Sequence, residues 1–335
     1  MKIEVKEISE LGREINFEIE EEIVNREKER IIKELKKNVE IEGFRKGKVP
    51  ERIIELRFSS LIKENLLKRI IPDAYLKAIK ENNLHPAVDP EIREVKFDDG
   101  KLFLKIYTEI KPEFDIKKYK NLVLKKVKPE EITEEKVENT LKEWERRPEF
   151  AASIVDPEKR RLWRKKIREQ LEYIAKREAT LKEEEQLWKQ LLQQVEFPVP
   201  EKLVYERARR YTEEHLRRMD LKGKTDSEIE KLANEYFEKF KPIARQDLKK
   251  YFILDKIAEK ENIIPDEKEV EERIMHLSRI TGKPLDEIKK NLERTGKIED
   301  LKEEIRIKKA FDFVKENAQV IERVVLPGEV RGEGK

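Results

Sequence analysis

The feature that most constrains the fold is an unbroken helix-forming segment near the middle of the chain. It begins at Asp156-Pro157, where the aspartate suits a helix cap and the proline suits the first helical position, and it runs to about Gln194. Pro198 and Pro200 end it. Charged residues make up 45% of the chain and hydrophobic residues 37%, a composition typical of long, solvated helices rather than of a compact barrel or sandwich.

The composition also excludes several classes of protein. Without cysteine the chain has no disulfide framework, no thiolate zinc site and no cysteine nucleophile. The three histidines, His85, His215 and His276, are too far apart in sequence to indicate a metal site or a Ser-His-Asp triad. We therefore expect no metal, no cofactor and no catalytic residue.

The distribution of apolar residues predicts a soluble, cytoplasmic protein with no membrane contact. No stretch approaches 18 apolar residues, and the first residues alternate charged and apolar side chains instead of forming a secretory segment. The excess of Glu and Lys and the missing cysteine resemble a thermophile composition.

The first 114 residues predict an α+β domain. Residues 2–8 and 13–19 alternate apolar and charged side chains with the period of a strand. A hairpin is predicted where the runs 92–97 and 102–110 flank Asp98-Asp99-Gly100. Apolar residues at helical spacing predict one helix from about 20 to 39 and a second that begins at Ser59 or Ser60 as its cap and ends near Asn82.

The remainder of the chain is predicted to be an elongated all-α body. Residues 115–150 form an extended arm followed by an arm helix that Thr133 opens. Residues 151–326 form a large helical domain, and residues 327–335 form a disordered tail. Beyond the long helix, further helices are predicted at about 201–219, 226–260, 266–280, 284–294 and 298–318.

Residues 43–50 carry the sharpest motif of the sequence. Gly43, Gly47 and Pro50 stop the preceding helix and predict an exposed loop. A phosphate-binding loop needs four residues between its glycines and a Ser or Thr after its lysine. Here three residues intervene and Val49 follows Lys48, so we expect no nucleotide at this loop.

The side chains of this loop suggest a docking surface. Phe44 is a large aromatic on an otherwise polar loop, and two acidic residues oppose the five cations of residues 43–57 (Arg45, Lys46, Lys48, Arg52 and Arg57). An apolar anchor flanked by cations is suited to an anionic, partly protein surface such as a ribonucleoprotein. The alternative is a solvated turn with incidental charges.

The pattern Gly43-Phe44-Arg45-x-Gly47-x-x-Pro50 resembles the ribosome-docking signature of bacterial trigger factor. The order of strands and helices around it, and the turn at residues 83–86, are similar to the trigger factor ribosome-binding domain. The helical remainder resembles the substrate-cradling C-terminal domain of that family.

The resemblance implies an ATP-independent, ribosome-associated chaperone that docks near the polypeptide exit tunnel and shields nascent chains from premature folding and aggregation. The implied partners are ribosomal protein and RNA, unfolded or nascent polypeptides, and a second copy of the chain as a homodimer. Phe44, Arg45 and Lys46 would make the docking contacts, and Gly43, Gly47 and Pro50 would shape the loop. The implied ribosome-binding set is Gly43, Phe44, Arg45, Lys46, Gly47, Lys48 and Pro50.

One departure from that family concerns enzymatic activity. Trigger factors typically carry an FKBP-like peptidyl-prolyl isomerase domain between the arm and the C-terminal helices. Here about ten residues, Pro148 to Pro157, join the two, whereas the smallest usual domain has about 50 residues. We therefore expect this chain to lack the isomerase domain and its activity.

Two other functions remain open from the sequence, a ribosome-independent helical holdase chaperone and an RNA-binding helical protein. The basic run 159–168 either contacts RNA or forms a solvated helix face paired with glutamates at helical spacing. Trp163 and Trp188 are predicted to anchor a core. Shallow apolar strips on the helices would hold unfolded chains, but the sequence does not separate strip residues from core residues.

Overall fold

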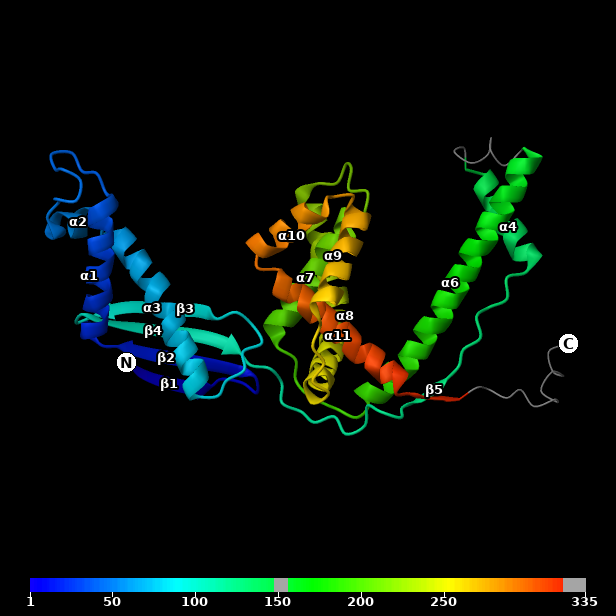
Figure 1. Cartoon of the computed structure of the whole chain (residues 1–335), viewed down its shortest axis with the longest axis horizontal. Helices are drawn as coiled ribbons and strands as arrows, with labels where there is room; N and C mark the ends of the chain where they lie inside the picture. The colour runs from blue at the N-terminus through cyan, green and yellow to red at the C-terminus, as the bar shows by residue number, and fades with distance from the viewer. Residues whose placement is uncertain (148–155, 322–335) are drawn as a thin grey trace. The chain divides into compact units, whose positions relative to one another are not determined.

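The structure is a computed structural model that describes residues 1–147 and 156–321. The chain forms two compact units, each built from two separate stretches. Unit 1 combines Met1–Glu113 with Phe197–Leu248, and unit 2 combines Phe114–Glu196 with Lys249–Lys335. The predicted tail and most of the predicted connection before Pro157 lie outside the described residues. Figure 1 labels the elements and colours them by their position along the chain.

The sheet of unit 1 has four antiparallel strands in the order β1-β2-β4-β3. They are β1 (Lys2–Glu7), β2 (Gly12–Ile19), β3 (Glu91–Asp98) and β4 (Lys101–Glu109). The predicted hairpin at Asp98-Asp99-Gly100 is present, and its two turn residues, Asp99 and Gly100, both have positive φ, 48° and 73°. All four predicted strands are therefore confirmed, but β3 is exposed along its whole length.

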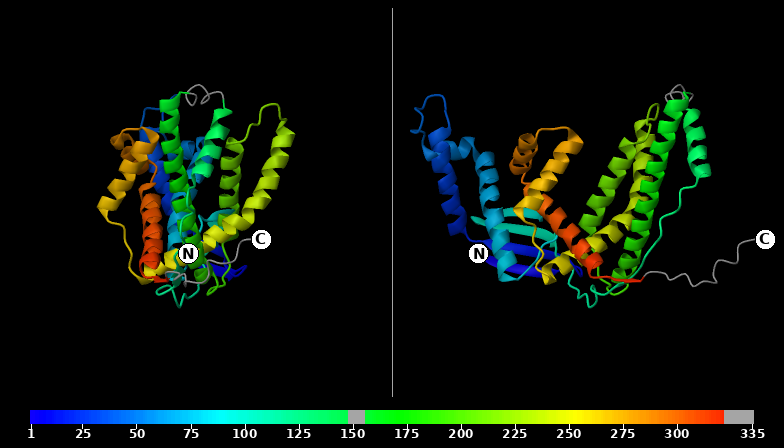
Figure 2. Two further views of the ribbon diagram at one scale, coloured as in Figure 1. Left: turned by 90° about the vertical axis from the view of Figure 1, so that its right-hand side faces the viewer. Right: turned by 45° about the vertical axis from the view of Figure 1, so that its right-hand side comes forward.

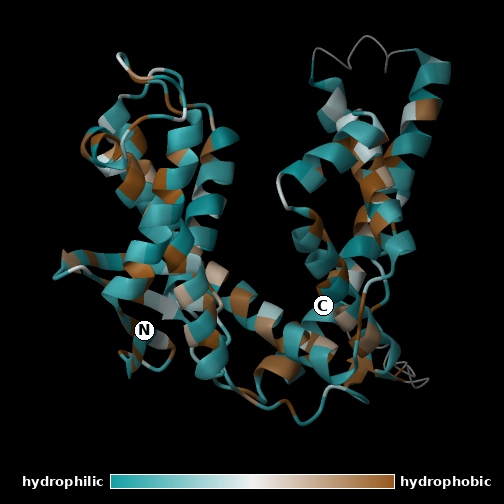
Figure 3. Ribbon diagram, turned by 60° about the vertical axis from the view of Figure 1, so that its left-hand side comes forward, coloured by the Kyte–Doolittle hydropathy of each residue, from teal (hydrophilic) through white to brown (hydrophobic). Residues whose placement is uncertain are grey.

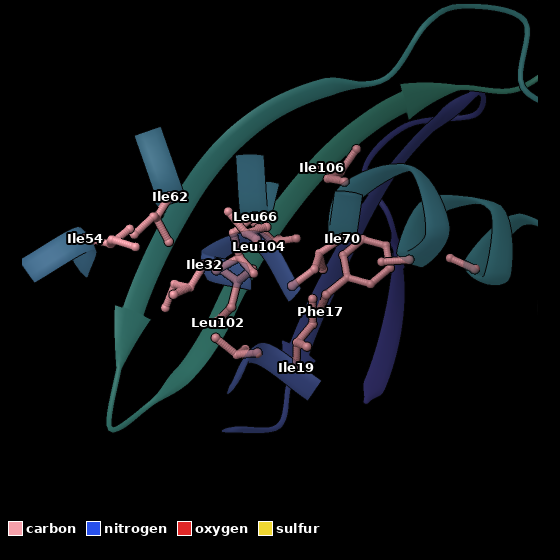
Figure 4. Close-up of a cluster of buried hydrophobic side chains, with 14 of the residues drawn as sticks. Phe17, Ile19, Ile32, Ile54, Ile62, Leu66, Ile70, Leu102, Leu104 and Ile106 are labelled. Atoms are coloured by element: carbon pink, nitrogen blue, oxygen red, sulfur yellow. The ribbon is translucent and has the colours of Figure 1, made fainter. Parts of the chain in front are cut away.

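Helices cover one face of this sheet. They are α1 (Glu21–Asn38) and α3 (Ser59–Glu81), and the short α2 (Glu51–Arg57) packs against both of them. Figure 4 shows the core between them, where Phe17 and Leu104 of the sheet meet Ile32 and Leu66 of the helices. Burial of these large apolar side chains is the main stabilising contribution in this part of unit 1.

Two details of the helices differ from the sequence prediction. Neither serine caps α3, because Phe58 occupies the cap position and makes no side-chain capping hydrogen bond. The helix α2 was not predicted, since seven residues give less than two full turns of apolar periodicity.

The helix α7 (Glu201–Arg217) and the first part of α8 (Asp226–Lys260) complete unit 1. The carboxylate of Glu109, at the end of β4, accepts a hydrogen bond from the backbone N–H of Lys202 at 3.0 Å. The Lys202 ammonium donates to the backbone carbonyl of Asp89 at 2.9 Å. A carboxylate at the first turn of a helix satisfies a free N–H group, so these contacts fix α7 to the sheet.

Unit 2 is mostly helical, and its two cap predictions are confirmed. The Asp156 carboxylate accepts from the N–H groups of Glu158 and Lys159, both at 3.0 Å, and the Thr133 hydroxyl accepts from the N–H of Lys136 at 3.2 Å. Besides the end of α8, its described helices are α4 (Glu134–Glu145), α6 (Pro157–Leu192), α9 (Glu267–Thr281), α10 (Leu285–Arg294) and α11 (Ile298–Glu316).

In unit 2, α4 lies beside the first half of α6 (Figures 1 and 2). Val137, Leu141 and Ile167 form a small buried cluster between them, against which Trp163 packs as predicted. The basic run of α6 crosses this interface: Arg160 pairs with Glu138 at 2.5 Å, and Arg164 and Arg168 pair with Glu134. These arginines therefore find their partners on α4 rather than at helical spacing on α6.

Two short strands in unit 2 were not predicted. They are β5 (Val123–Lys125), within the arm, and β6 (Gln319–Ile321), which follows α11, and they pair in parallel. Trp188, the other predicted core anchor, is half-buried and stacks on Phe311 with ring centroids 4.7 Å apart. None of the helices in the described ranges is long and apolar enough to cross a membrane.

Candidate functional site

The motif loop projects from the end of α1 and α2 that lies away from the sheet (Figure 1). Ile41 and Val49 anchor its two sides in the core of unit 1, where they are 7% and 0% exposed. The residues between them are mostly exposed. The sequence therefore buries both ends of the loop and presents its tip to solvent.

Two tight turns shape the tip, and each depends on a glycine. Gly43 has a φ of +87° and Gly47 a φ of +79°. The Phe44 N–H donates to the Ile41 carbonyl at 3.0 Å, and the Lys48 N–H donates to the Arg45 carbonyl at 2.9 Å. A Cβ at either glycine would meet nothing within 4 Å, so the backbone conformation, and not packing, requires glycine here.

Pro50 ends the loop and begins α2. Its carbonyl accepts from the N–H groups of Ile53 and Ile54 at 3.0 and 3.3 Å. A proline also restricts the preceding residue to extended backbone, which here is the buried Val49. The loop therefore enters α2 in one defined direction.

The acidic residues of α2 do not neutralise the tip. Glu51 pairs with Lys36 at 3.2 Å and Glu55 with Lys28 at 3.4 Å, so both carboxylates are engaged by α1. Lys46 lies 3.6 Å from Glu40. Among the described residues, the other four cations of the segment have no ion-pair partner: Arg45, Lys48, Arg52 and Arg57.

The loop and α2 together thus combine exposed cations with exposed apolar side chains. Phe44 is 39% exposed, and Leu56 of α2 is 73% exposed. Sequence reasoning missed Leu56, because an apolar residue in a short unpredicted helix gives no signal of its own orientation. The structure places all seven predicted residues, from Gly43 to Pro50, in this one loop. The described residues include no group of three or more His, Asp or Glu side chains that could hold a metal ion.

The helices carry a second exposed apolar surface. Figure 3 shows hydrophobic segments distributed among largely hydrophilic helices. On α6, four large apolar side chains are exposed: Leu162, Tyr173, Ile174 and Leu181. At 3.6 residues per turn they fall within an arc of about 120° of the helix circumference, which forms one stripe. The exposure of each side chain thereby distinguishes the apolar residues on the surface of α6 from those in the core, a distinction that the sequence did not make.

Unit 2 also contains a pocket of about 650 Å³ lined by α9, α11 and the segment before α9. Its apolar lining comes from Ile264, Val270, Ile274 and Ile298. At its edge Arg306 pairs with the buried Asp255 and with Glu303.

The family model described as "Bacterial trigger factor protein (TF)" matches residues 1–144, and the model described as "Bacterial trigger factor protein (TF) C-terminus" matches residues 162–316.

The chain belongs to the trigger factor family.

Only the N-terminal and C-terminal trigger factor models are found, and residues 145–161 lie between them. The "Trigger factor" of Geotalea uraniireducens (strain Rf4) is 39% identical over 144 residues, which is 43% of this chain and 33% of that protein. The "Trigger factor" of Natranaerobius thermophilus is 39% identical over 131 residues, 38% of this chain and 29% of that protein. The chain thus spans about a third of the length of the curated trigger factors it matches.

A solved structure described as "Promiscuous Substrate Recognition in Folding and Assembly Activities of the Trigger Factor Chaperone" has a similar fold. The TM-score is 0.53 at 15% sequence identity, and the match covers 94% of this chain and 99% of that one. At this identity the likeness shows the trigger factor fold, an α+β N-terminal region with a helical remainder, as predicted.

Proposed function

We propose that this trigger factor is an ATP-independent chaperone of the cytoplasm that docks on the ribosome near the exit tunnel and shields nascent chains. The observation that carries the proposal is the tip at residues 43–50. Two glycine turns hold Phe44 and Arg45 outward, and the neighbouring carboxylates are engaged by α1. An apolar anchor among unpaired cations suits a surface built of RNA and protein.

The exposed apolar side chains of unit 2 are the proposed contacts for the emerging polypeptide. The α6 stripe and the pocket beside α9 each present apolar area framed by charged residues. Burying such area stabilises a complex by about 25 cal/mol per Å², so shallow patches give weak, reversible contacts. Release then needs no nucleotide, which agrees with the absence of a phosphate-binding sequence at the loop.

We further propose that the chain acts without proline isomerase activity. The two matched family models leave only residues 145–161 between them. A chromogenic proline-isomerisation assay on a short peptide should give the uncatalysed rate. A second copy of the chain is the proposed partner off the ribosome, and sedimentation velocity over a range of concentrations would detect the dimer.

Co-sedimentation with bacterial ribosomes tests the docking proposal. The test variant replaces Phe44, Arg45 and Lys46 with alanine. The matched control replaces Lys63, Lys96 and Phe97, which also removes two cations and one aromatic of similar exposure (38%, against 39% for Phe44). We expect the wild-type chain and the control to pellet with ribosomes and the loop variant to remain in solution.

Equal pelleting of the loop variant and the control would refute the docking role of the loop. If none of the three proteins pelleted but all suppressed aggregation of an unfolded protein, the ribosome-independent holdase would be the correct function.

A further inference from the structure

The arm segment around β5 is held to α6 by a ladder of glutamine side chains. The N–H of Val123 donates to Gln190 Oε1 at 3.0 Å, and Gln190 Nε2 donates to the Val123 carbonyl at 2.7 Å. Gln186 makes the same two bonds with the backbone of Lys125, both at 3.0 Å. Gln194 repeats them with Lys118 at 3.0 and 2.8 Å.

The spacing of these glutamines explains the fit. Four residues of a helix rise about 6 Å, and two residues of a strand rise about 6.6 Å. Gln186 and Gln190 therefore match Lys125 and Val123 along β5. Each side-chain amide offers one acceptor oxygen and N–H donors, as a peptide group does. Along this edge of β5, α6 takes the place of a neighbouring strand, and its glutamine amides bond main-chain atoms.

The opposite edge of β5 pairs with β6. The N–H of Gln319 donates to the Leu122 carbonyl at 2.8 Å, and the N–H of Lys126 donates to the Ile321 carbonyl at 3.1 Å. This parallel register turns the N–H groups of Gln319 and Ile321 toward β5 and that of Val320 away from it.

The strand β5 is held in place more firmly than its neighbour β6. Leu122 and Leu124 of the arm are buried, at 1% and 7% exposed, so packing and the glutamine ladder both fix β5. In contrast, β6 has three residues, all exposed, and Val320 and Ile321 are 53% and 43% exposed. Short elements with few buried contacts open first, so β6 can leave while β5 keeps its strand conformation.

We propose that this edge of β5 is a binding site for an extended segment of an unfolded polypeptide, which pairs with β5 in place of β6. A preformed strand edge recognises the main chain of an added strand, so its affinity depends little on sequence. In this arrangement β6 is an intramolecular competitor for the site. The inference rests on the proposed chaperone function and specifies how a client segment is held.

The test measures peptide binding to three full-length proteins: the wild type, Ile321→Pro and Val320→Pro. Proline at 321 removes an N–H that faces β5, whereas proline at 320 removes one that faces away, so the second variant is the matched control. The probe is a fluorescent ten-residue peptide of Val and Thr with lysines at its ends. Its twin carries N-methyl groups on four consecutive central residues, which removes donors from both edges.

We expect the dissociation constant measured by fluorescence anisotropy to fall about tenfold in Ile321→Pro and to stay within about twofold in Val320→Pro, because only the first weakens the competitor. The methylated twin should bind at least about tenfold more weakly to all three proteins. In Ile321→Pro, hydrogen exchange at the Leu124 and Lys126 amides should be faster than in the wild type, and the unmethylated peptide should slow it again.

The inference would be overturned by equal affinity of the peptide for all three proteins, by equal binding of the methylated twin, or by exchange at Leu124 and Lys126 that the peptide does not change. An aggregation assay on the same proteins keeps the two proposals apart. If the proteins suppressed aggregation but did not bind the peptide at β5, this inference alone would be refuted. If the wild type did not suppress aggregation, the chaperone function itself would be refuted.

Discussion

At the scale of single residues, the loop at residues 43–50 depends on backbone conformation more than on packing. Gly43 and Gly47 lie in open space, yet both have positive φ, where an ordinary side chain is strained against its own carbonyl oxygen. The residues that would contact the ribosome are therefore oriented by two glycines whose Cβ positions are open to solvent. The roles within the motif are therefore distinct: the glycines set the path of the backbone, and Phe44 and the cations are the proposed contact surface.

Replacing Gly47 with alanine tests this role of the backbone. We expect the free energy of unfolding to fall by about 1–2 kcal/mol, because an L-residue must adopt the left-handed conformation. Gly47→Asn should lose less, since asparagine tolerates that region better. Denaturant unfolding of the three proteins measures both changes. If Gly47→Ala were as stable as the wild type, the positive φ would not be what makes glycine necessary.

Glu303 contributes a pH-dependent interaction in unit 2. Burial alone would raise its pKa, but hydrogen bonds from Arg306 and Tyr251 outweigh burial and hold the pKa below the usual 4.5. Burial and the same carboxylate raise the pKa of Tyr251 well above its usual value. Because the folded state binds the Glu303 proton less readily than the unfolded chain does, the interaction stabilises unit 2 above pH 4.5 and is lost as the pH falls below it.

Unfolding in denaturant at a series of pH values checks this prediction. Between about pH 6 and about pH 3.5 the wild type should lose more stability than Glu303→Gln, which does not titrate. The glutamine Oε1 can still accept from Tyr251 Oη and Arg306 Nη2, whereas its Nε2 cannot accept the hydrogen bond that Arg306 Nε donates to the carboxylate. Parallel curves for the two proteins would show that Glu303 keeps an ordinary pKa.

At the scale of elements, α4 is attached to α6 by a very small apolar cluster. Among the described residues of this cluster, Val137, Leu141 and Ile167 are the fully buried ones, and Trp144 and Trp163 pack edge to face beside them with ring centroids 5.6 Å apart. Arginines of α6 and glutamates of α4 surround this cluster. Exposed ion pairs contribute about 0–1 kcal/mol each, so the apolar cluster decides whether α4 stays attached.

Leu141→Ala should therefore release α4 without unfolding the rest of the unit. Truncating a buried leucine costs about 2–5 kcal/mol, which a cluster of this size cannot compensate. In a Trp188→Phe background, tryptophan fluorescence reports only Trp144 and Trp163 and should shift to the red. Circular dichroism should lose about the signal of the 12 residues of α4. A larger loss of helix would mean that α4 and α6 unfold together with their unit.

At the scale of the whole molecule, charge is abundant but nearly balanced. The chain has 77 Lys and Arg residues against 74 Asp and Glu residues, a formal net charge of +3. In the basic run of α6, which the sequence left open as an RNA contact, the three arginines Arg160, Arg164 and Arg168 pair with glutamates of α4. The unpaired cations of the tip are therefore a local feature of a chain with little overall attraction for polyanions.

This charge distribution predicts different behaviour toward bare RNA and toward ribosomes. Binding to an isolated ribosomal RNA fragment should be no tighter than the non-specific range, about 10⁻⁴–10⁻⁶ M at physiological salt. Ribosome binding should weaken with salt, with a slope of log K against log salt no steeper than about −4 if four cations contact phosphates. Mobility-shift and co-sedimentation assays measure the two. Tight, steeply salt-dependent binding to bare RNA would favour the RNA-binding alternative.

The sequence by itself determined the features that depend on near neighbours. The caps Thr133 and Asp156, the turn at Asp99-Gly100, and the helix Asp226–Lys260 were all predictable, because backbone sterics and hydrogen bonds within a few residues produce them. The glycine loop was predictable for the same reason, and its motif indicated the family.

Only the tertiary structure decided which distant residues meet. The carboxylate of Glu109 at the N-terminus of α7, the glutamine ladder on β5, the strand β6 and the exposure of Leu56 have no signature in the sequence. Each depends on the path of the chain between residues far apart, and a glutamine on a charged helix looks the same whether it faces water or a neighbouring main chain. Local patterns therefore predicted the long helices, the four strands of the sheet and the exposed loop at residues 43–50. The short elements α2, β5 and β6 and the partners of the arm depend on contacts between residues far apart in the sequence.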